Sequence, residues 1–247
     1  NLDDMISGFL DWLVNTANFW LFTFRDLTRA IAWVIEMPYQ FLRNLLIEGF
    51  QTGLGDAAVQ IAPSLSWIAV IAIVIGIGHT ARDWGLAALA GACFLYLAVF
   101  GQWDSAMVTL ASVLVAVPIG AVGGLLLGIL AYRRPWVERL LRPVLDLMQT
   151  VPVFAYLVPI LILFGFGPVA ALVATVIYAM PPMIRVSIVA LKGVPEELLE
   201  AARMMGATPR QMTWKVLVPA AVPTLMVGVN QVIMLTLNMV IIASMIG

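Results

Sequence analysis

Long apolar runs separated by short polar segments dominate the chain from about residue 61 onward. A helix needs roughly 20 apolar residues to cross the hydrocarbon core of a bilayer. Six segments have this character and are predicted to be membrane-spanning helices: 61–78, 84–101, 106–131, 144–165, 168–191 and 217–246. The pattern therefore predicts an all-α, polytopic membrane helix bundle.

Residues 1–60 follow a different pattern. Between about 17 and 36, apolar side chains recur at spacings of three and four, and charges such as Arg25 and Arg29 interrupt the run. This is typical of an amphipathic helix, which Pro38 is expected to end. A charge in mid-bilayer costs about 2.5–3.5 kcal/mol. We therefore expect this helix to lie in the membrane interface.

The distribution of charge indicates how the spans are oriented. Nine of the 13 Lys and Arg residues fall in alternate loops: Arg82, Arg133, Arg134, Arg139, Arg142, Lys192, Arg203, Arg210 and Lys215. The positive-inside rule places these loops in the cytoplasm. Residues 1–60, with seven acidic and three basic side chains, then lie outside. Two domains are predicted: an extracytoplasmic or interfacial segment, 1–60, and a transmembrane domain, 61–247.

Composition supports a multi-pass membrane protein, and the resemblance described below implies the cell (inner) membrane. The chain is 62% hydrophobic and 11% charged, whereas a soluble domain is about half apolar and a quarter charged. Its net charge of −1 gives no reason to expect a nucleic-acid partner. The sequence has one cysteine and one histidine, and their positions form no metal-ligand spacing. No bound metal ion is therefore expected.

A few side chains within the spans stand out. Arg185 is the one basic residue inside a span, where it is expected to snorkel toward the cytoplasmic end or to take part in gating. Asp146 is expected to pair with Arg142, four residues earlier. Three glycines spaced by four allow another helix to approach closely, and packing within one subunit is favoured over a dimer seam: Gly120, Gly124 and Gly128.

The polar insert before the last span, 192–219, is predicted to fold as two short helices joined by a sharp bend. Pro195 suits the first turn of a helix, and Gly206 suits its C-terminal end. Thr208 is then expected to cap a second helix, with Pro209 at the first position. The two helices are predicted to stand on the cytoplasmic surface.

This insert also carries a motif. Glu200-Ala201-Ala202, then Gly206, then Val216-Leu217-Val218-Pro219 resembles the EAA loop of binding-protein-dependent ABC importer permeases, with Val218 in place of the usual leucine. In that family the loop docks into a groove of a cytoplasmic ATPase. The resemblance implies that the ATPase-coupling residues are Glu200, Ala201 and Ala202 as the contact surface, Gly206 as the bend, and Pro219.

Further segments resemble the glycine betaine, proline betaine and choline permeases of that family: 146–152, 156–159, 179–185, 206–211, 230–231 and 241–246. The resemblance runs over roughly 40–247, and the interfacial N-terminal helix that precedes this range also resembles that subfamily. Relatives usually continue beyond Ile246, so a truncated end is expected here.

That resemblance implies a membrane-spanning permease subunit of an ATP-driven importer for a small betaine-like solute. It implies a homodimer of permeases, a cytoplasmic ABC ATPase subunit that hydrolyses ATP, and an extracytoplasmic solute-binding protein. No cofactor is expected on this chain. Nor is an ATPase site, since the sequence has no glycine-rich phosphate loop ending in Lys-Ser or Lys-Thr.

The solute path is less sharply predicted. Met148, Gln149, Pro152 and Phe154 are the candidates to line it, although packing in the bilayer also explains Met148, Pro152 and Phe154. Trimethylamine N-oxide or another small solute is the alternative cargo. A secondary transporter would need carboxylates within the membrane, and a membrane enzyme a nucleophile–base set or metal ligands. A non-transporting structural subunit is a further alternative. The sequence does not distinguish among quaternary ammonium solutes, and it does not show whether osmotic strength gates transport.

Overall fold

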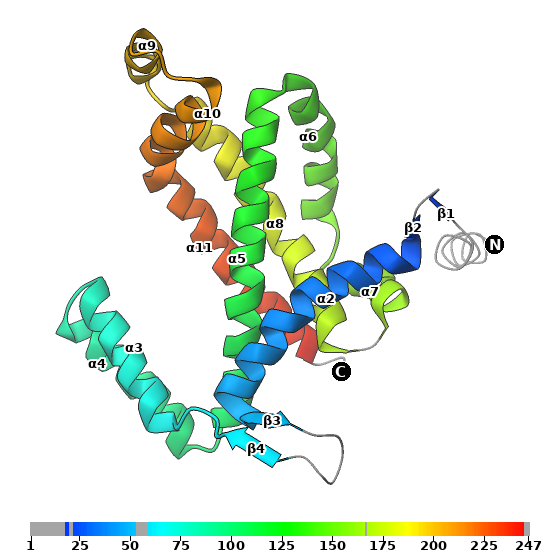
Figure 1. Ribbon diagram of the computed structural model, residues 1–247, viewed down its shortest axis with the longest axis vertical. Coiled ribbons are helices and arrows are strands. Elements are labelled where there is room, and N and C mark those ends of the chain that lie inside the picture. The colour runs from blue at the N-terminus through cyan, green and yellow to red at the C-terminus, as the bar shows by residue number, and fades with distance from the viewer. Residues whose placement is uncertain (1–17, 20–21, 53–58, 166, 245–247) are drawn as a thin grey trace. The chain divides into compact units, whose positions relative to one another are not determined.

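The computed structural model describes residues 18–19, 22–52, 59–165 and 167–244, which are mostly helical (Figure 1). Two short antiparallel hairpins pair β1 (Asn18–Phe19) with β2 (Phe22–Thr23) and β3 (Phe50–Thr52) with β4 (Val59–Ala62). The chain divides into two compact units, one formed by Val34–Leu114 and the other by Asn1–Trp33 with Val115–Gly247. The helical fold class is as predicted.

The amphipathic helix near the N-terminus starts and ends later than predicted. Helix α2 spans Phe24–Arg43, and a π-helical turn, η1 (Asn44–Glu48), continues it. The expectation that Pro38 ends the helix is wrong, because Pro38 lies inside it. The flanking residues Ile35 and Tyr39, four apart, are both buried. Burial of that face offsets the backbone hydrogen bond that proline removes. Predicted positions 17, 20 and 21 lie outside the described residues.

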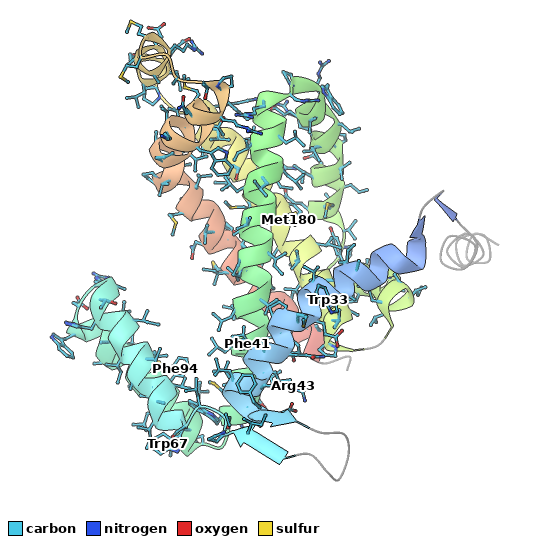
Figure 2. The ribbon with its side chains drawn as sticks, viewed as in Figure 1. Trp33, Phe41, Arg43, Trp67, Phe94 and Met180 are labelled. Atoms are coloured by element: carbon cyan, nitrogen blue, oxygen red, sulfur yellow. The ribbon has the colours of Figure 1, made fainter. Side chains whose placement is uncertain are left out.

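Helices α3 (Trp67–Ala81) and α4 (Trp84–Val99) pack against each other within the unit Val34–Leu114. Figure 2 labels one aromatic side chain on each, Trp67 and Phe94. The helices contain 15 and 16 residues, which corresponds to about 22–24 Å. That is shorter than the roughly 30 Å hydrocarbon core. The segments predicted as spans, 61–78 and 84–101, therefore contain apolar helices that are shorter than predicted.

Three of the predicted spans are confirmed as helices long and apolar enough to cross a membrane. They are α5 (Trp103–Arg133), α8 (Pro168–Lys192) and α11 (Val218–Ser244). In its membrane-length window α8 is 61% buried, against 33% for α5 and for the helix that ends in α11. Helix α8 is therefore the central element of its unit.

The glycines of α5 allow this packing. A Cβ on Gly124 would come within 2.7 Å of Met183 Cβ on α8, and one on Gly128 would collide with Ser187. A Cβ on Gly120 would meet Val232 of α11 at 3.3 Å. A Cβ on Gly123 would lie 3.0 Å from the Met180 side chain, which Figure 2 labels. The prediction that these glycines pack within one chain is confirmed.

The predicted span 144–165 is wrong as a continuous helix. The structure has two helices there, α6 (Pro135–Thr150) and α7 (Phe154–Phe164), bent by 106° to each other. Val151 is extended, with ψ 130°. A residue before proline avoids the helical region, so Pro152 explains why the helix stops here. If the bent pair is counted as one span, the described residues contain up to four.

Candidate coupling surface and transport path

The polar insert 192–219, called the coupling segment below, folds as predicted into short helices at one end of α8 and α11 (Figure 1). Helix α9 spans Glu196–Met204, α10 spans Pro209–Gln211, and the π-helical η3 (Met212–Leu217) leads into α11. Pro195 takes the N-cap position rather than the first turn, and two glutamates follow it. Their negative charge stabilises the positive end of the α9 dipole.

The bend between the helices depends on Gly206. Its φ of 76° lies in the left-handed region, which side chains with a Cβ rarely adopt. The N–H of Ala207 donates to the Ala202 carbonyl at 3.0 Å, and that of Gly206 to the Arg203 carbonyl at 2.9 Å. This is a Schellman ending. A Cβ on Gly206 would have free space, so backbone conformation, and not crowding, requires glycine.

A capping box starts the next helix. Thr208 Oγ1 accepts the N–H of Gln211 at 3.4 Å, and Gln211 Oε1 accepts the N–H of Thr208 at 2.8 Å. Pro209 occupies the first helical position, as predicted. These reciprocal bonds satisfy two backbone donors that a helix start otherwise leaves free. The segment is therefore held by local bonds on both sides of its bend.

The predicted contact residues on α9 differ in exposure. Ala202 is 3% exposed and packs into this chain. Glu200 is exposed, Ala201 is half-buried, and Pro219, in the first turn of α11, is exposed. Two residues that the sequence reasoning missed, Met204 and Met205, are each 83% exposed. Two apolar residues directly before the bend glycine of a polar insert are the signal that could have found them.

Arg133 ties the coupling segment to α5, and the sequence reasoning had treated it only as one of the cytoplasmic charges. Its terminal nitrogen donates to the Pro209 carbonyl at 2.7 Å and also to the Thr213 hydroxyl. Its Nε donates to the same hydroxyl at 3.1 Å. Thr213 is 3% exposed. Arg133 therefore joins η3 to the C-terminal end of α5, the helix whose glycines contact α8.

Three pairs link α8 to α6 and α7, and we call them the polar seam: Lys192 with Glu138, Arg185 with Asp146, and Tyr178 with Tyr156. The α8 members are seven residues apart, which places them on one face of that helix. Their partners run the opposite way along α6 and α7. The polar seam thus follows α8 from its C-terminal end, at Lys192, to Tyr178 near its middle.

Glu138 is the most enclosed charge of the polar seam, with 11% of its side chain exposed. It lies in the polar part of α6, ahead of the predicted span. Lys192 Nζ contacts its two carboxylate oxygens at 2.7 and 2.8 Å, and Arg142 contacts one at 2.7 Å. The hydrogen bond from Lys192, followed by that from Arg142, holds the pKa of Glu138 below its ordinary 4.5. Arg142 therefore pairs with Glu138, and the prediction that it pairs with Asp146 is wrong.

The candidate path residues gather around the break between α6 and α7. Met148 is half-buried, and its carbonyl accepts a hydrogen bond from the Tyr156 hydroxyl. Gln149 and Pro152 are exposed, and Phe154, the first residue of α7, is 57% exposed. Among the described residues, no group of three or more His, Cys, Asp or Glu side chains could hold a metal ion.

Comparison with known proteins agrees with this geometry. Residues 120–247 match the family described as binding-protein-dependent transport system inner membrane component. This chain belongs to that family. As an inner membrane component, a member of this permease family is expected to contain membrane-length helices, and α5, α8 and α11 meet that requirement.

Individual relatives are similar over most or all of the chain. The glycine betaine/proline betaine transport system permease protein ProW of Escherichia coli is 42% identical over 250 residues, covering 100% of this chain and 63% of that protein. The glycine betaine transport system permease protein OpuAB of Bacillus subtilis is 38% identical over 246 residues, covering 100% and 79%. The trimethylamine N-oxide transport system permease protein TmoV of Ruegeria pomeroyi is 45% identical over 221 residues, covering 90% and 32%. The chain thus spans under two thirds of the length of ProW and about a third of the length of TmoV.

Proposed function

We propose that this chain is the membrane-spanning permease subunit of an ATP-driven importer for a small betaine-like solute. The observation that carries the proposal is the coupling segment, a doubly capped helical bend that presents exposed apolar side chains at one end of an apolar bundle. Such a segment suits force transmission, because capped short helices move as rigid bodies. The names of the ProW and OpuAB relatives support the choice of solute.

A cytoplasmic ABC ATPase subunit is the partner proposed for the coupling segment. The ATPase hydrolyses ATP, and this chain contributes no ATPase site and binds no cofactor. Glu200 and the half-buried Ala201 would join Met204 and Met205 at its surface, with Gly206 fixing the bend. A second copy of the permease and an extracytoplasmic solute-binding protein complete the proposed assembly.

The proposed topology places residues 1–60 outside or in the membrane interface and 61–247 in the membrane, with the coupling segment in the cytoplasm. Two of the predicted cytoplasmic loops, those of Arg133 and Thr213, are hydrogen-bonded to each other, which supports their location on one side. The solute would pass the break between α6 and α7, where Met148, Gln149, Pro152 and Phe154 gather.

Trimethylamine N-oxide is the second candidate solute, and the 45% identical TmoV relative favours it. It shares a methylated nitrogen with betaine but has no carboxylate. A secondary transporter is a weaker proposal, because α9 and its exposed methionines would then have no partner to contact.

The test is ATP-dependent uptake of labelled glycine betaine into vesicles that contain the full chain with its ATPase and binding protein. We expect uptake that requires ATP and all three components, with excess choline and trimethylamine N-oxide ranking the solutes as competitors. Uptake without the ATPase would instead support a secondary transporter. A chain that never associates with an ATPase would contradict the assignment of the coupling segment.

A further inference from the structure

The inner two pairs of the polar seam join α8, a helix of membrane length, to α6 and α7, and the proposed coupling role does not use them. Arg185 donates to the Asp146 carboxylate across 39 positions of sequence. Tyr156 and Tyr178 meet with ring centroids 5.6 Å apart and planes at 69°. An ionised pair within the membrane is costly, and such residues usually mark a substrate or ion path. These pairs therefore require an explanation beyond packing.

Exposure shows which kind of surroundings the ion pair needs. In the single chain 41% of the Arg185 side chain and 68% of the Asp146 side chain are exposed. Charged groups so open cannot face lipid at low cost, because hydrocarbon offers them no hydrogen bonds. Snorkelling to the cytoplasm is disfavoured as well, since helical side chains lean toward the N-terminus of their helix. This part of the polar seam is thus suited to line a water-filled path.

Arg185 also has unused hydrogen-bonding capacity. Among the described residues, its buried Nε–H has no acceptor, although its terminal nitrogen binds Asp146. A buried guanidinium donor without a partner is unfavourable, and a planar guanidinium is well shaped to bind a second carboxylate. Asp146 occupies one terminal nitrogen and 41% of the Arg185 side chain is exposed, so the guanidinium keeps donors for a second carboxylate.

The tyrosine pair offers the complementary chemistry. Two rings at a steep angle form a corner, and each half-buried ring keeps part of its surface open. The hydroxyl of Tyr156 is bound to the Met148 carbonyl, which fixes that ring. Aromatic ring faces attract quaternary ammonium groups. Tyr178 and Arg185 are seven residues apart on one face of α8, or about 10 Å along its axis, and Arg185 leans toward the tyrosines.

We propose that this part of the polar seam is a transient binding site for the zwitterionic solute, with the Tyr156–Tyr178 corner receiving the quaternary ammonium group and the Arg185 guanidinium receiving the carboxylate. Asp146 keeps the affinity for the carboxylate low, because it already neutralises Arg185. Weak binding suits a path, since a solute must also leave each site. The inference rests on the proposed function, and it assigns residues that a coupling role alone does not require.

The experiment measures glycine betaine uptake per ATP hydrolysed, with the full chain, its ATPase and its binding protein in vesicles. The informative variant replaces both charges by apolar residues, Arg185→Met with Asp146→Leu. Replacing both partners of an ion pair by apolar groups is often neutral for folding. We therefore expect normal insertion and ATPase stimulation, with uptake per ATP reduced by about tenfold or more.

The tyrosines are tested in the same way. Tyr178→Leu should lower betaine uptake by about tenfold, whereas Tyr178→Phe, which keeps the ring face, should stay within about twofold of the parent chain. Ile177→Leu, at an exposed neighbouring position on another side of α8, is the matched control and should change nothing.

Two results would overturn the inference. Normal uptake by the double apolar variant would mean that the ion pair only holds helices together, and normal uptake by Tyr178→Leu would remove the ammonium site. Failure of the proposed function looks different, since the parent chain would then show no ATP-dependent betaine uptake. A double variant that does not insert is replaced by Arg185→Lys, which keeps the charge but loses the planar donor set and should still lower uptake.

Discussion

Between Pro195 and Gln211, backbone and capping bonds between residues two to five positions apart in sequence shape the coupling segment, and the bond from Arg133 to the Pro209 carbonyl is the long-range addition. In the polar seam, the ion pairs join residues 39 and 54 positions apart. The first region forms its shape from its own sequence, whereas the second exists only when α6 returns beside α8. The difference teaches that the coupling segment can act as a preformed body, while the polar seam reports how the bundle is arranged.

The largest expected effect follows from disturbing the preformed bend. We expect Gly206→Val to reduce ATP-dependent uptake to background, because a β-branched residue resists the positive φ of this position. Uptake and membrane insertion are measured together, and insertion should be retained. Gly193→Ala is the matched control, since Gly193 has an ordinary helical φ of −83°. Normal uptake by Gly206→Val would show that the bend is not needed.

The next effect concerns the exposed end of α9. Met205→Asp should weaken association with the ATPase by about tenfold, because it places a charge in an apolar contact. Association is measured by co-purification at graded ATPase concentrations. Ala202→Asp is the contrasting variant, because Ala202 is buried in this chain, and there the expected loss is in folding and insertion. Equal behaviour of the two variants would contradict the surface assigned to α9.

The tie between the coupling segment and α5 gives a smaller and more specific effect. Arg133→Met removes hydrogen bonds to Pro209 and Thr213, and we expect uptake per ATP to fall by about fivefold while ATP hydrolysis continues. The adjacent Arg134→Met is the control for the loss of one positive charge. If both variants keep the parent ratio of uptake to hydrolysis, movement does not pass through Arg133.

The smallest effect is expected at the Glu138–Lys192 end of the polar seam. Glu138→Gln should destabilise the purified protein by about 1–3 kcal/mol, because Lys192 and Arg142 lose their shared carboxylate. The measurement is thermal unfolding in detergent at neutral pH. Glu200→Gln, at an exposed position on α9, is the control and should leave the midpoint unchanged.

The same carboxylate predicts a pH dependence. The pKa of Glu138 is lowered in the folded protein, so its contribution is present above the ordinary value of 4.5 and is lost as pH falls through the lowered pKa. We expect the parent chain to lose more stability than Glu138→Gln when the pH is lowered below about 4.5. Parallel losses in the two proteins would show that other groups dominate acid unfolding.

Local patterns explain what the sequence could predict. The long apolar runs of α5, α8 and α11 predict membrane helices because lipid requires them. Gly206, Thr208 and Pro209 predict the bend and the cap because those preferences act over a few residues.

Predictions failed where the outcome depended on several local preferences or on distant contacts. Val151 before Pro152 breaks a run whose apolar content predicted one continuous span, and buried neighbours carry α2 through Pro38.

The sequence by itself thus determined a helical membrane protein, its membership of a permease family by motif, and the local shape of the coupling segment. Only the tertiary structure decided that Ala202 faces inward while Met204 and Met205 face outward, and that Arg133 reaches Thr213. It alone paired Arg185 with Asp146 and Tyr156 with Tyr178. The physical reason is that capping bonds are set by neighbours in sequence, whereas burial and ion pairing depend on which helix faces come together.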